Sequence, residues 1–398
     1  MRRYIEGIEQ FAIDVILERR YGKRATLLRV FLRALSVLFR KIVQLRLALF
    51  QKRYFREHQL GCMVISIGNL TVGGTGKTPV VEMLGKALNA SGRKVAILSR
   101  GYKSAKPPLL RRIWGRITGR SAIAPPRIVS DGSKVLLDSR ISGDEPYMLA
   151  KNLPGVVVLT DKDRVKSGFF AIEKFQSDTL ILDDGLQYLH LKHRLDIVLI
   201  DRTAPFGNEY LLPRGTLREP PEHLRRAHLI FITKCNDLGN EALIERIRRY
   251  NRTADIIECR HAPKYFQDVT TGDQLPLHYL ENKYVAAVSG IAVPEGFESI
   301  LRELGANIEF TKRFTDHHRY DESELRNLLN RCIKRDIDAI VTTEKDAVRL
   351  PRLKKLEVPI YFLRIEIEIL SGRQHWERCL QLISHPPMHP ESQLFMPF

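Results

Sequence analysis

The sequence predicts an α/β protein with a mainly parallel sheet, helices on both of its faces and a smaller second α/β part. Short runs of Val, Ile and Leu alternate with segments of helical periodicity. Continuously apolar strands between helices are typical of parallel sheets that are buried on both sides. The length of 398 residues fits two domains or one elaborated domain. A basic amphipathic helix is expected before the first strand.

This first element covers residues 25–51. Its polar positions Arg29, Arg33, Ser36 and Arg40 line one helical face, and Leu, Val and Phe fill most of the remainder. Such a helix can lie in the membrane interface with its arginines at the lipid headgroups. The alternative is an ordinary helix packed on the domain. We favour the membrane surface because the apolar arc is wide for a surface helix.

Residues 64–78 predict a strand, a glycine-rich turn and the start of a helix. Glycines allow successive backbone N–H groups to converge on phosphate oxygens, and the helix adds its positive N-terminal end. A lysine here can reach the β- and γ-phosphates, and the following threonine hydroxyl can bind Mg²⁺. Thr71 stands where the usual pattern has its first glycine. The core is therefore expected to resemble P-loop NTPases, with nucleotide contacts from Thr71, Gly73, Gly74, Thr75, Gly76, Lys77 and Thr78.

The remaining elements follow from apolar runs and helical periodicity. Strands are expected at 64–67, 94–98, 179–182, 196–200, 229–233, 284–289, 339–342 and 358–363. Helices are expected at 77–89, 145–151, 164–175, 241–250, 294–304 and 322–334. Residues 103–126 predict a loop, 251–283 lack strong periodicity, and the Pro-rich tail from 385 is expected to be extended or disordered. The chain is therefore divided into an N-terminal helical region (1–60), a nucleotide-binding core (61–255), a junction (256–283), a second α/β lobe (284–384) and a tail (385–398).

Two adjacent acids, Asp183 and Asp184, end the apolar strand at 179–182. In P-loop proteins an aspartate at a strand end completes the Mg²⁺ shell, directly or through water. For one of the two, the alternative is a cap of a helix or turn. Both are candidates for the metal site, and the sequence does not decide which of them is closer to Mg²⁺.

Asp144 and His317 are further candidates for chemistry. Asp144 lies at a Gly/Pro turn before a helical segment, where a plain N-cap is the favoured interpretation from spacing alone. His317 follows Asp316, which could orient it as a proton acceptor, although a surface histidine is the simpler interpretation. Charged clusters at 160–164, 211–220 and 342–346 are each weak signals, because such clusters are usually solvated.

The composition favours anionic partners in a reducing compartment. Lys and Arg number 64 against 46 Asp and Glu, a net charge of +18 that attracts nucleic acid, anionic lipid or phosphorylated substrates. The 5 cysteines are widely spread without a CxxC pair, which indicates reduced thiols and disfavours a zinc site. No stretch reaches the roughly 18 uncharged residues of a membrane-spanning helix.

Taken in order, several motifs resemble one family, the tetraacyldisaccharide 4′-kinases of lipid A biosynthesis. The resemblance covers about 66 to 346, and the ordered set is far more specific than any single motif. The shortened GGTGKT loop, with Thr71 before it, is the form that this family has. The motifs are SIGNLTVGGTGKTP (66–79), SRGY (99–102), GDEP (143–146), TDKDR (160–164), LDDGLQ (182–187), FGNEYLLPRGTLREP (206–220), DHH (316–318) and TEKD (343–346).

This resemblance implies transfer of the ATP γ-phosphoryl group to the 4′-hydroxyl of an acylated glucosamine disaccharide 1-phosphate, with Mg²⁺ as cofactor. Asp144 and His317 match an Asp–His pair thought to activate the acceptor hydroxyl, and Lys77 would act on the phosphates. Arg164 and Arg218 are candidates for phosphates of ATP or substrate. The family's N-terminal helix is held to associate with the inner membrane, which implies a peripheral protein on the cytoplasmic face.

Two other functions remain to be weighed. Thr233, Lys234 and Asp237 faintly resemble a guanine-reading motif of switching GTPases, but the leading Asn is missing. A nucleic-acid-dependent ATPase would explain the charge of +18. However, the basic residues in 25–51 alternate with bulky aliphatics rather than with stacking aromatics, so lipid is the more natural anion. No nucleic-acid partner is therefore expected.

Overall fold

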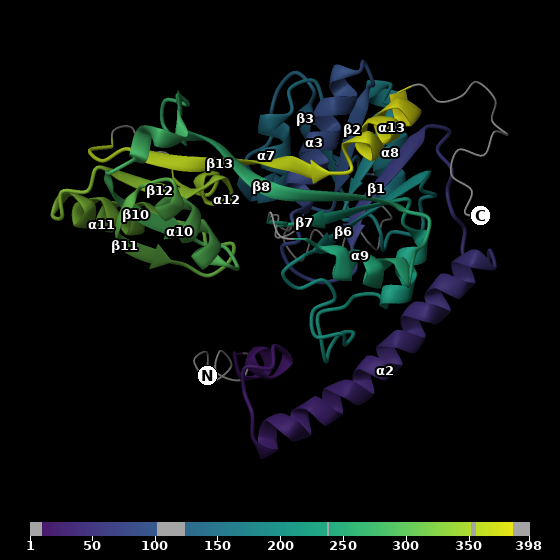
Figure 1. The fold of residues 1–398 in the computed structure, drawn as a ribbon. Coiled ribbons are helices and arrows are strands. Elements are labelled where there is room, and N and C mark those ends of the chain that lie inside the picture. The colour runs from purple at the N-terminus through teal and green to yellow at the C-terminus, as the bar shows by residue number, and fades with distance from the viewer. Residues whose placement is uncertain (1–9, 102–123, 237–238, 352–355, 385–398) are drawn as a thin grey trace.

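The computed structural model describes residues 10–101, 124–236, 239–351 and 356–384. Its strands form one sheet of 13 strands in the order β11-β10-β12-β13-β8-β7-β6-β1-β5-β2-β4-β3, with β9 paired to β8 (Figure 1). Most pairs are parallel, so the expected α/β architecture with a mainly parallel sheet is confirmed. Most of the loop expected at 103–126 and the tail from 385 lie outside the described residues.

The first half of the sheet is parallel except at its edge, where β3 runs antiparallel to β4. All residues of β2, β5 and β7 are buried, which explains their continuous apolar runs. The strands of this half are β1 (Met63–Asn69), β2 (Val95–Ser99), β3 (Arg127–Asp131), β4 (Val157–Thr160), β5 (Thr179–Asp183), β6 (Leu195–Asp201) and β7 (Leu229–Thr233).

Helices cover both faces of this half. On one face α3 (Lys77–Ala90), α7 (Asp144–Asn152) and α13 (Arg373–Ser384) contribute apolar side chains to one core cluster. On the other face α8 (Arg164–Phe175) and α9 (Glu241–Arg248) contribute to two further clusters. The short elements α6 (Ser139–Ser142) and the 3₁₀ helix η1 (Pro221–Arg226) lie in the connections. Residues 284–384 were expected to form the second lobe, yet α13 packs on the first half through Trp376, Cys379 and Ile383.

Two long strands, β8 (Asp255–Asp268) and β13 (Ile360–Ser371), connect the halves and pair antiparallel along their length. The start of β8 pairs with β7, and the start of β13 pairs with β12. Between these points the two strands pair with each other, and we call this part the linking ribbon (Figure 1). The sequence pattern missed β8 because the ribbon has half-exposed and charged positions on both faces instead of an apolar run.

The second half contains β10 (Tyr284–Ser289), β11 (Asn307–Arg313) and β12 (Ala339–Thr343). Two core clusters lie on its two faces, one with α10 (Pro294–Glu303) and one with α11 (Glu322–Ile333). The short pieces α12 (Glu344–Ala347), β9 (Gln274–Leu275) and η2 (Leu277–Leu280) complete it. The edge strand β11 was not predicted, because it is mostly exposed and has no apolar run.

The N-terminal helix α2 (Lys23–Gln51) extends along one side of the molecule, largely clear of the sheet (Figure 1). Its polar face is turned toward the protein: Ser36 donates a hydrogen bond to the Leu211 carbonyl at 2.9 Å, and Arg40 pairs with Glu222 at 3.0 Å. Arg33 lies over the Tyr210 ring. Residues 210–222 thus supply partners for Arg33 and Arg40, and the expected contact of the arginines with lipid headgroups stays a prediction.

The opposite face of α2 is apolar and open. Its exposed large side chains are Leu27, Val30, Phe31, Leu35, Val37, Leu38, Ile42 and Leu45. In an ordinary surface helix such a stripe packs on the core. None of the helices in the described ranges has the length and apolar character needed to cross a membrane.

Candidate active site

The phosphate-binding loop connects β1 to α3 at the centre of the first half. Gly76, the N-cap of α3, has φ +80°, a left-handed conformation that favours glycine. A Cβ atom there would also lie 2.5 Å from Nε2 of His261, which packs against the loop from β8. Gly73 has φ +119°. At these two positions any residue with a Cβ atom would be strained, so glycine permits the turn. The backbone N–H groups at the start of α3 are left free of helical partners.

Lys77 is held at the end of β1 by two polar partners. Its Nζ donates to Asn69 Oδ1 at 3.0 Å and lies 3.5 Å from Asp184 Oδ1. The buried Asn69 also donates from Nδ2 to the Thr71 carbonyl at 2.8 Å. Thr71 is itself buried, and its backbone pairs with Leu217. Thr71 thus joins the phosphate-binding loop to the loop that carries the predicted phosphate ligand Arg218.

The two acids at the end of β5 lie in different environments. Asp183 is buried and accepts a hydrogen bond from Ser99 Oγ at 3.0 Å. Burial, together with the negative charges of Glu145 and Asp184, raises the pKa of Asp183 to about 7. Asp184 has φ +56°, so the chain turns directly after the strand.

Asp184 is fully paired. Arg218 donates to both of its carboxylate oxygens at 2.8 Å. Burial alone would raise the pKa of Asp184, but the hydrogen bonds from Arg218 and the charge of Lys77 hold it far below its usual range. One carboxylate is thus neutralised by protein cations, whereas its neighbour Asp183 is buried with a deficit of positive charge.

This difference predicts an effect of pH on stability. The unfolded chain loses the Asp183 proton near pH 3.9, while the folded protein keeps it to about 7. The folded state then binds more protons in this window, so stability falls as pH rises from about 4 to 7. Asp183→Asn has no such titrating group. The free energy of unfolding of this variant, relative to that of the parent protein, is therefore expected to increase as pH rises from about 4 to 7. Denaturant unfolding near pH 5 and pH 8 without nucleotide checks this, and a constant difference between the proteins would contradict it.

Two guanidinium groups near this carboxylate pair have unused donors. Arg164 begins α8, is buried and lies over the Tyr188 ring at 5.0 Å. Burial lowers the pKa of Arg164, opposed chiefly by the charge of Asp183. The Nε atoms of Arg164 and Arg218 are buried without a hydrogen-bond partner in the part of the chain that the structure describes. Unpaired buried N–H donors are costly, and an anion such as phosphate would satisfy them.

Asp144 and His317 meet although they lie 173 positions apart, with 3.1 Å between Asp144 Oδ2 and His317 Nδ1. Asp144 is the first residue of α7 and is 6 % exposed. His317 has φ +65° in the connection between β11 and α11. The structure thus brings together a carboxylate from the first half and an imidazole from the second.

Two arginines complete the surroundings of Asp144. Arg349 Nε lies 2.9 Å from Asp144 Oδ2, and Arg319 Nη2 lies 3.1 Å from Oδ1. Burial would raise the pKa of Asp144, but the hydrogen bond with His317 and the charges of Arg349 and Arg319 hold it below its usual range. Asp144 is therefore an anion at neutral pH.

Arg349 is fully buried and also contacts Asp346 at 3.1 Å and the Gly290 carbonyl at 3.3 Å. Its Nη2 lies 3.2 Å from His317 Nδ1, which can accept from Arg349 or donate to Asp144, but not both. No sequence motif predicted a role for Arg349. Its spacing of three residues from Asp346 was the available signal, because a buried acid needs a cation near it.

Glu145 connects the two groups of residues. It follows Asp144, and its charge raises the pKa of Asp183. Lys345 of the second half lies 3.4 Å from Glu145. The GDEP, DHH and TEKD segments therefore converge beside the phosphate-binding loop, and a molecule bound there would face donors, a carboxylate and an imidazole together.

The family model described as "Tetraacyldisaccharide-1-P 4'-kinase" matches residues 28–384, a range that contains every residue of this site. The tetraacyldisaccharide 4'-kinase of Syntrophus aciditrophicus (strain SB) is 39% identical over 368 residues, covering 90% of this chain and 93% of that protein. The enzyme of the same name from Anaeromyxobacter dehalogenans (strain 2CP-C) is 40% identical over 347 residues, covering 86% and 87%.

Among solved structures, the chain is similar to LpxK from Aquifex aeolicus. That crystal structure is described as an "apo" form in complex with ATP. The two share 27% sequence identity with a TM-score of 0.67, and the match covers 90% of this chain and 100% of that one.

Proposed function

The chain belongs to the family of tetraacyldisaccharide-1-P 4'-kinases, and from this premise we propose how its residues carry out the reaction. As a family member it is a kinase that transfers the γ-phosphoryl group of ATP to the 4′-hydroxyl of tetraacyldisaccharide 1-phosphate in lipid A biosynthesis, with Mg²⁺. The resemblance of the ordered motifs to this family is confirmed. The contact between Asp144 and His317 is the observation that carries our assignment of roles.

Lys77 and the loop N–H groups would hold the β- and γ-phosphates. Arg164 and Arg218, each with a buried Nε that lacks a partner in the described ranges, would donate to the phosphates of ATP or of the lipid. Phosphoryl transfer depends mostly on positioning and charge neutralisation. These hydrogen-bond donors would therefore supply most of the catalytic effect by holding the phosphates and stabilising their negative charge.

The hydroxyl and carboxylate oxygens near the phosphate-binding loop are of the kind that bind a divalent cation such as Mg²⁺. Mg²⁺, when bound, neutralises negative charge on the phosphate oxygens. We assign the Thr78 hydroxyl and the Asp183 carboxylate as its protein ligands. The support is electrostatic: Asp183 is buried with a raised pKa, whereas Asp184 is already paired with Arg218 and Lys77. Asp184 would instead fix these two cations in place.

Asp144 would accept a hydrogen bond from the 4′-hydroxyl and orient its oxygen toward the γ-phosphorus. As the new bond from this oxygen to phosphorus forms and the bond to the bridging oxygen of ADP breaks, the hydroxyl proton passes to Asp144. The arginines beside Asp144 make it a weak base, so it takes the proton late, when the hydroxyl has become acidic. His317, with its proton on Nδ1, would donate to Asp144 Oδ2 and hold the carboxylate in place.

A direct assay tests this function. Purified protein is incubated in detergent micelles with radiolabelled ATP, Mg²⁺ and tetraacyldisaccharide 1-phosphate, and the lipid product is separated. A labelled bis-phosphorylated lipid is the expected result. Folded protein that binds ATP without labelling the lipid would contradict it.

We further propose that the protein lies at the cytoplasmic face of the inner membrane, with the open face of α2 in the lipid. The acceptor is amphiphilic, and α2 exposes Leu27, Phe31, Leu38 and further apolar side chains on one side. The polar face of the helix is used by contacts to the body. Apolar burial would therefore contribute more than charge to the binding.

A pair of substitutions on this face tests the proposal. Phe31→Ser with Leu38→Ser is expected to reduce binding to lipid vesicles by tenfold or more, since each buried side chain of this size contributes about 1.5–3 kcal/mol. Vesicle flotation measures it. Gln44→Ala, an exposed polar position on α2, is the control and should bind normally. Equal flotation of all three proteins would exclude this face as the membrane contact.

A further inference from the structure

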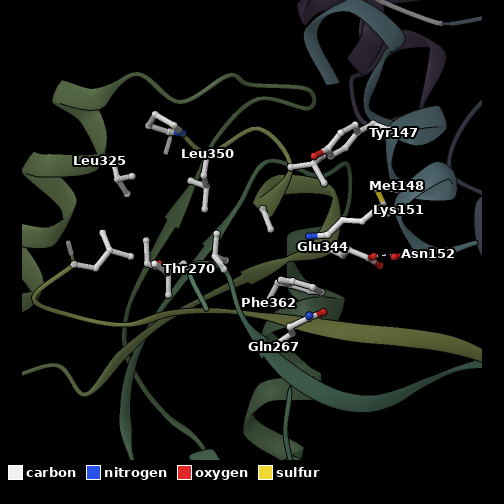
Figure 2. Close-up of a pocket in the computed structure, with 16 residues that line it drawn as sticks. Tyr147, Met148, Lys151, Asn152, Gln267, Thr270, Leu325, Glu344, Leu350 and Phe362 are labelled. Atoms are coloured by element: carbon white, nitrogen blue, oxygen red, sulfur yellow. Dashed lines mark hydrogen bonds between the residues drawn. The ribbon is translucent and has the colours of Figure 1, made fainter. Parts of the chain in front are cut away.

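A buried charge cluster lies where the linking ribbon leaves the second half. Arg364 of β13 directly follows the last residue of β13 that pairs with β12. Its guanidinium pairs with Glu82 of α3 and with Glu344 of α12, the latter at 2.7 Å. Asn152 donates to Glu344 at 2.7 Å (Figure 2) and to Glu82 at 3.2 Å. We call these four residues the Arg364 cluster.

Each of the three helices that enter this cluster leads to a residue of the active site. α3 opens with the phosphate-binding lysine and carries Glu82 further along. α7 begins at Asp144 and ends at Asn152. α12 begins at Glu344 and leads to Arg349, which contacts Asp144. The cluster therefore contacts the nucleotide-binding helix, the helix that begins with Asp144 and the helix that leads to its partner Arg349.

The chemistry of the cluster allows little freedom. Arg364 is 5 % exposed and Glu82 is 9 % exposed, so water compensates little for a lost partner. A planar guanidinium can serve two carboxylates in fixed directions, which an ammonium group cannot do. Without the cation, the buried Glu82 carboxylate and the partly buried Glu344 carboxylate would face each other and would have to separate, take up a proton or admit water.

The surroundings show why such a link is needed. Beside the cluster, the halves are connected by the linking ribbon, in which the two strands pair with each other alone over the middle of β8 and β13. A cavity of about 440 Å³ borders the cluster between α7 and the second half, with Asn152 and Glu344 in its wall (Figure 2). Packing is thus incomplete here, and the ion pairs supply a defined contact.

We propose that Arg364 is a positioning residue for phosphoryl transfer, which holds α3, α7 and α12 in the one arrangement that places Asp144 beside the bound phosphates. The inference rests on the proposed role of Asp144. Arg364 contacts neither reactant in this arrangement; it acts through the helices that carry Lys77 and Asp144.

The test compares two reactions of the same protein. Arg364→Met is expected to lower kcat for lipid phosphorylation by about 100-fold, the effect of a displacement near 1 Å. The Kd for ATP should stay within about threefold, and the rate of any ATP hydrolysis measured without lipid should not fall, because Lys77, Arg164 and Arg218 belong to the first half and lie outside the Arg364 cluster. Glu368→Gln is the matched control, since this residue lies on the same strand and pairs at the exposed surface with Arg260.

A second variant separates positioning from stability. This variant combines Glu82→Gln, Glu344→Gln and Arg364→Met, which leaves the cluster without charge. The melting temperature of the combined variant should approach that of the parent protein, while its lipid phosphorylation stays low. Recovery of full kcat in the combined variant would overturn the proposal. So would an equal loss of lipid phosphorylation and lipid-independent hydrolysis in Arg364→Met.

Asp144→Asn, measured in parallel, distinguishes the proposed role of Arg364 from the proposed role of Asp144. If Asp144→Asn loses activity and Arg364→Met retains it, the positioning role alone fails. If Asp144→Asn keeps normal turnover, the assignment of Asp144 fails first, and the positioning role with it.

Discussion

Asp144→Asn is expected to lower kcat for lipid phosphorylation by about 10²- to 10⁴-fold, the usual contribution of a positioned proton acceptor. The amide keeps the size of the side chain, although its single oxygen can accept from only one of Arg349 and Arg319, which contact different carboxylate oxygens. It cannot accept the hydroxyl proton. ATP affinity should remain nearly unchanged, because Asp144 contacts His317 and two arginines rather than the phosphate-binding loop.

Steady-state kinetics with lipid acceptor and equilibrium binding of ATP measure the two quantities separately. Asp138→Asn is the matched control: it lies six residues earlier, is exposed and caps α6 through its side chain, a role that asparagine also fills. Normal turnover of Asp144→Asn would remove it as the proton acceptor. A parallel loss of ATP affinity would indicate damage to the core instead.

Lys77→Met should affect both binding and turnover. The ammonium group is held within reach of Asn69 and Asp184 at the start of α3, and the loss of a charged hydrogen bond to phosphate costs ~1.5–3 kcal/mol. ATP should therefore bind about 10- to 100-fold more weakly. Because negative charge is redistributed over the phosphate oxygens during transfer, kcat at saturating ATP should fall by a further 10²- to 10³-fold, roughly the value of one such donor.

Lys86→Met provides the comparison, since Lys86 lies on the same helix with an exposed side chain. Titration of both variants with ATP gives the Kd, and turnover at saturating ATP gives the kcat. If Lys77→Met binds ATP weakly but has a normal kcat, the lysine contributes to ATP binding and gives no additional stabilisation of the transition state.

The fold was predictable where local signals and burial agree. The expected strands of the nucleotide-binding half, such as 229–233, coincide with fully buried strands that admit only apolar residues. Strand β8 was missed because neither face of the linking ribbon is fully buried. Helix α13 was also missed, although Trp376, Cys379 and Ile383 recur with the spacing of a buried helical face.

The site was predictable to a smaller extent. The phosphate-binding loop can be predicted from local sequence alone, because its glycines, lysine and threonine are adjacent in the chain and all serve to bind phosphate and its Mg²⁺. The pairing of Asp144 with His317 came from family resemblance, since no local pattern shows that distant positions meet. Arg349 and Arg364 were overlooked because charged residues in a sequence are usually solvated, and their burial is a consequence of tertiary structure.

The packing of α13 has a consequence for the order of synthesis. Its side chains Trp376, Cys379 and Ile383 belong to the same core cluster as Ile65 and Ile67 of β1, although the entire second half is translated between them. A ribosome that has completed the first half must therefore make the second half before the last layer of the first core emerges. The nascent nucleotide-binding half consequently exposes part of its interior until late in translation, while the second half, which is continuous in the chain, can complete its own core first.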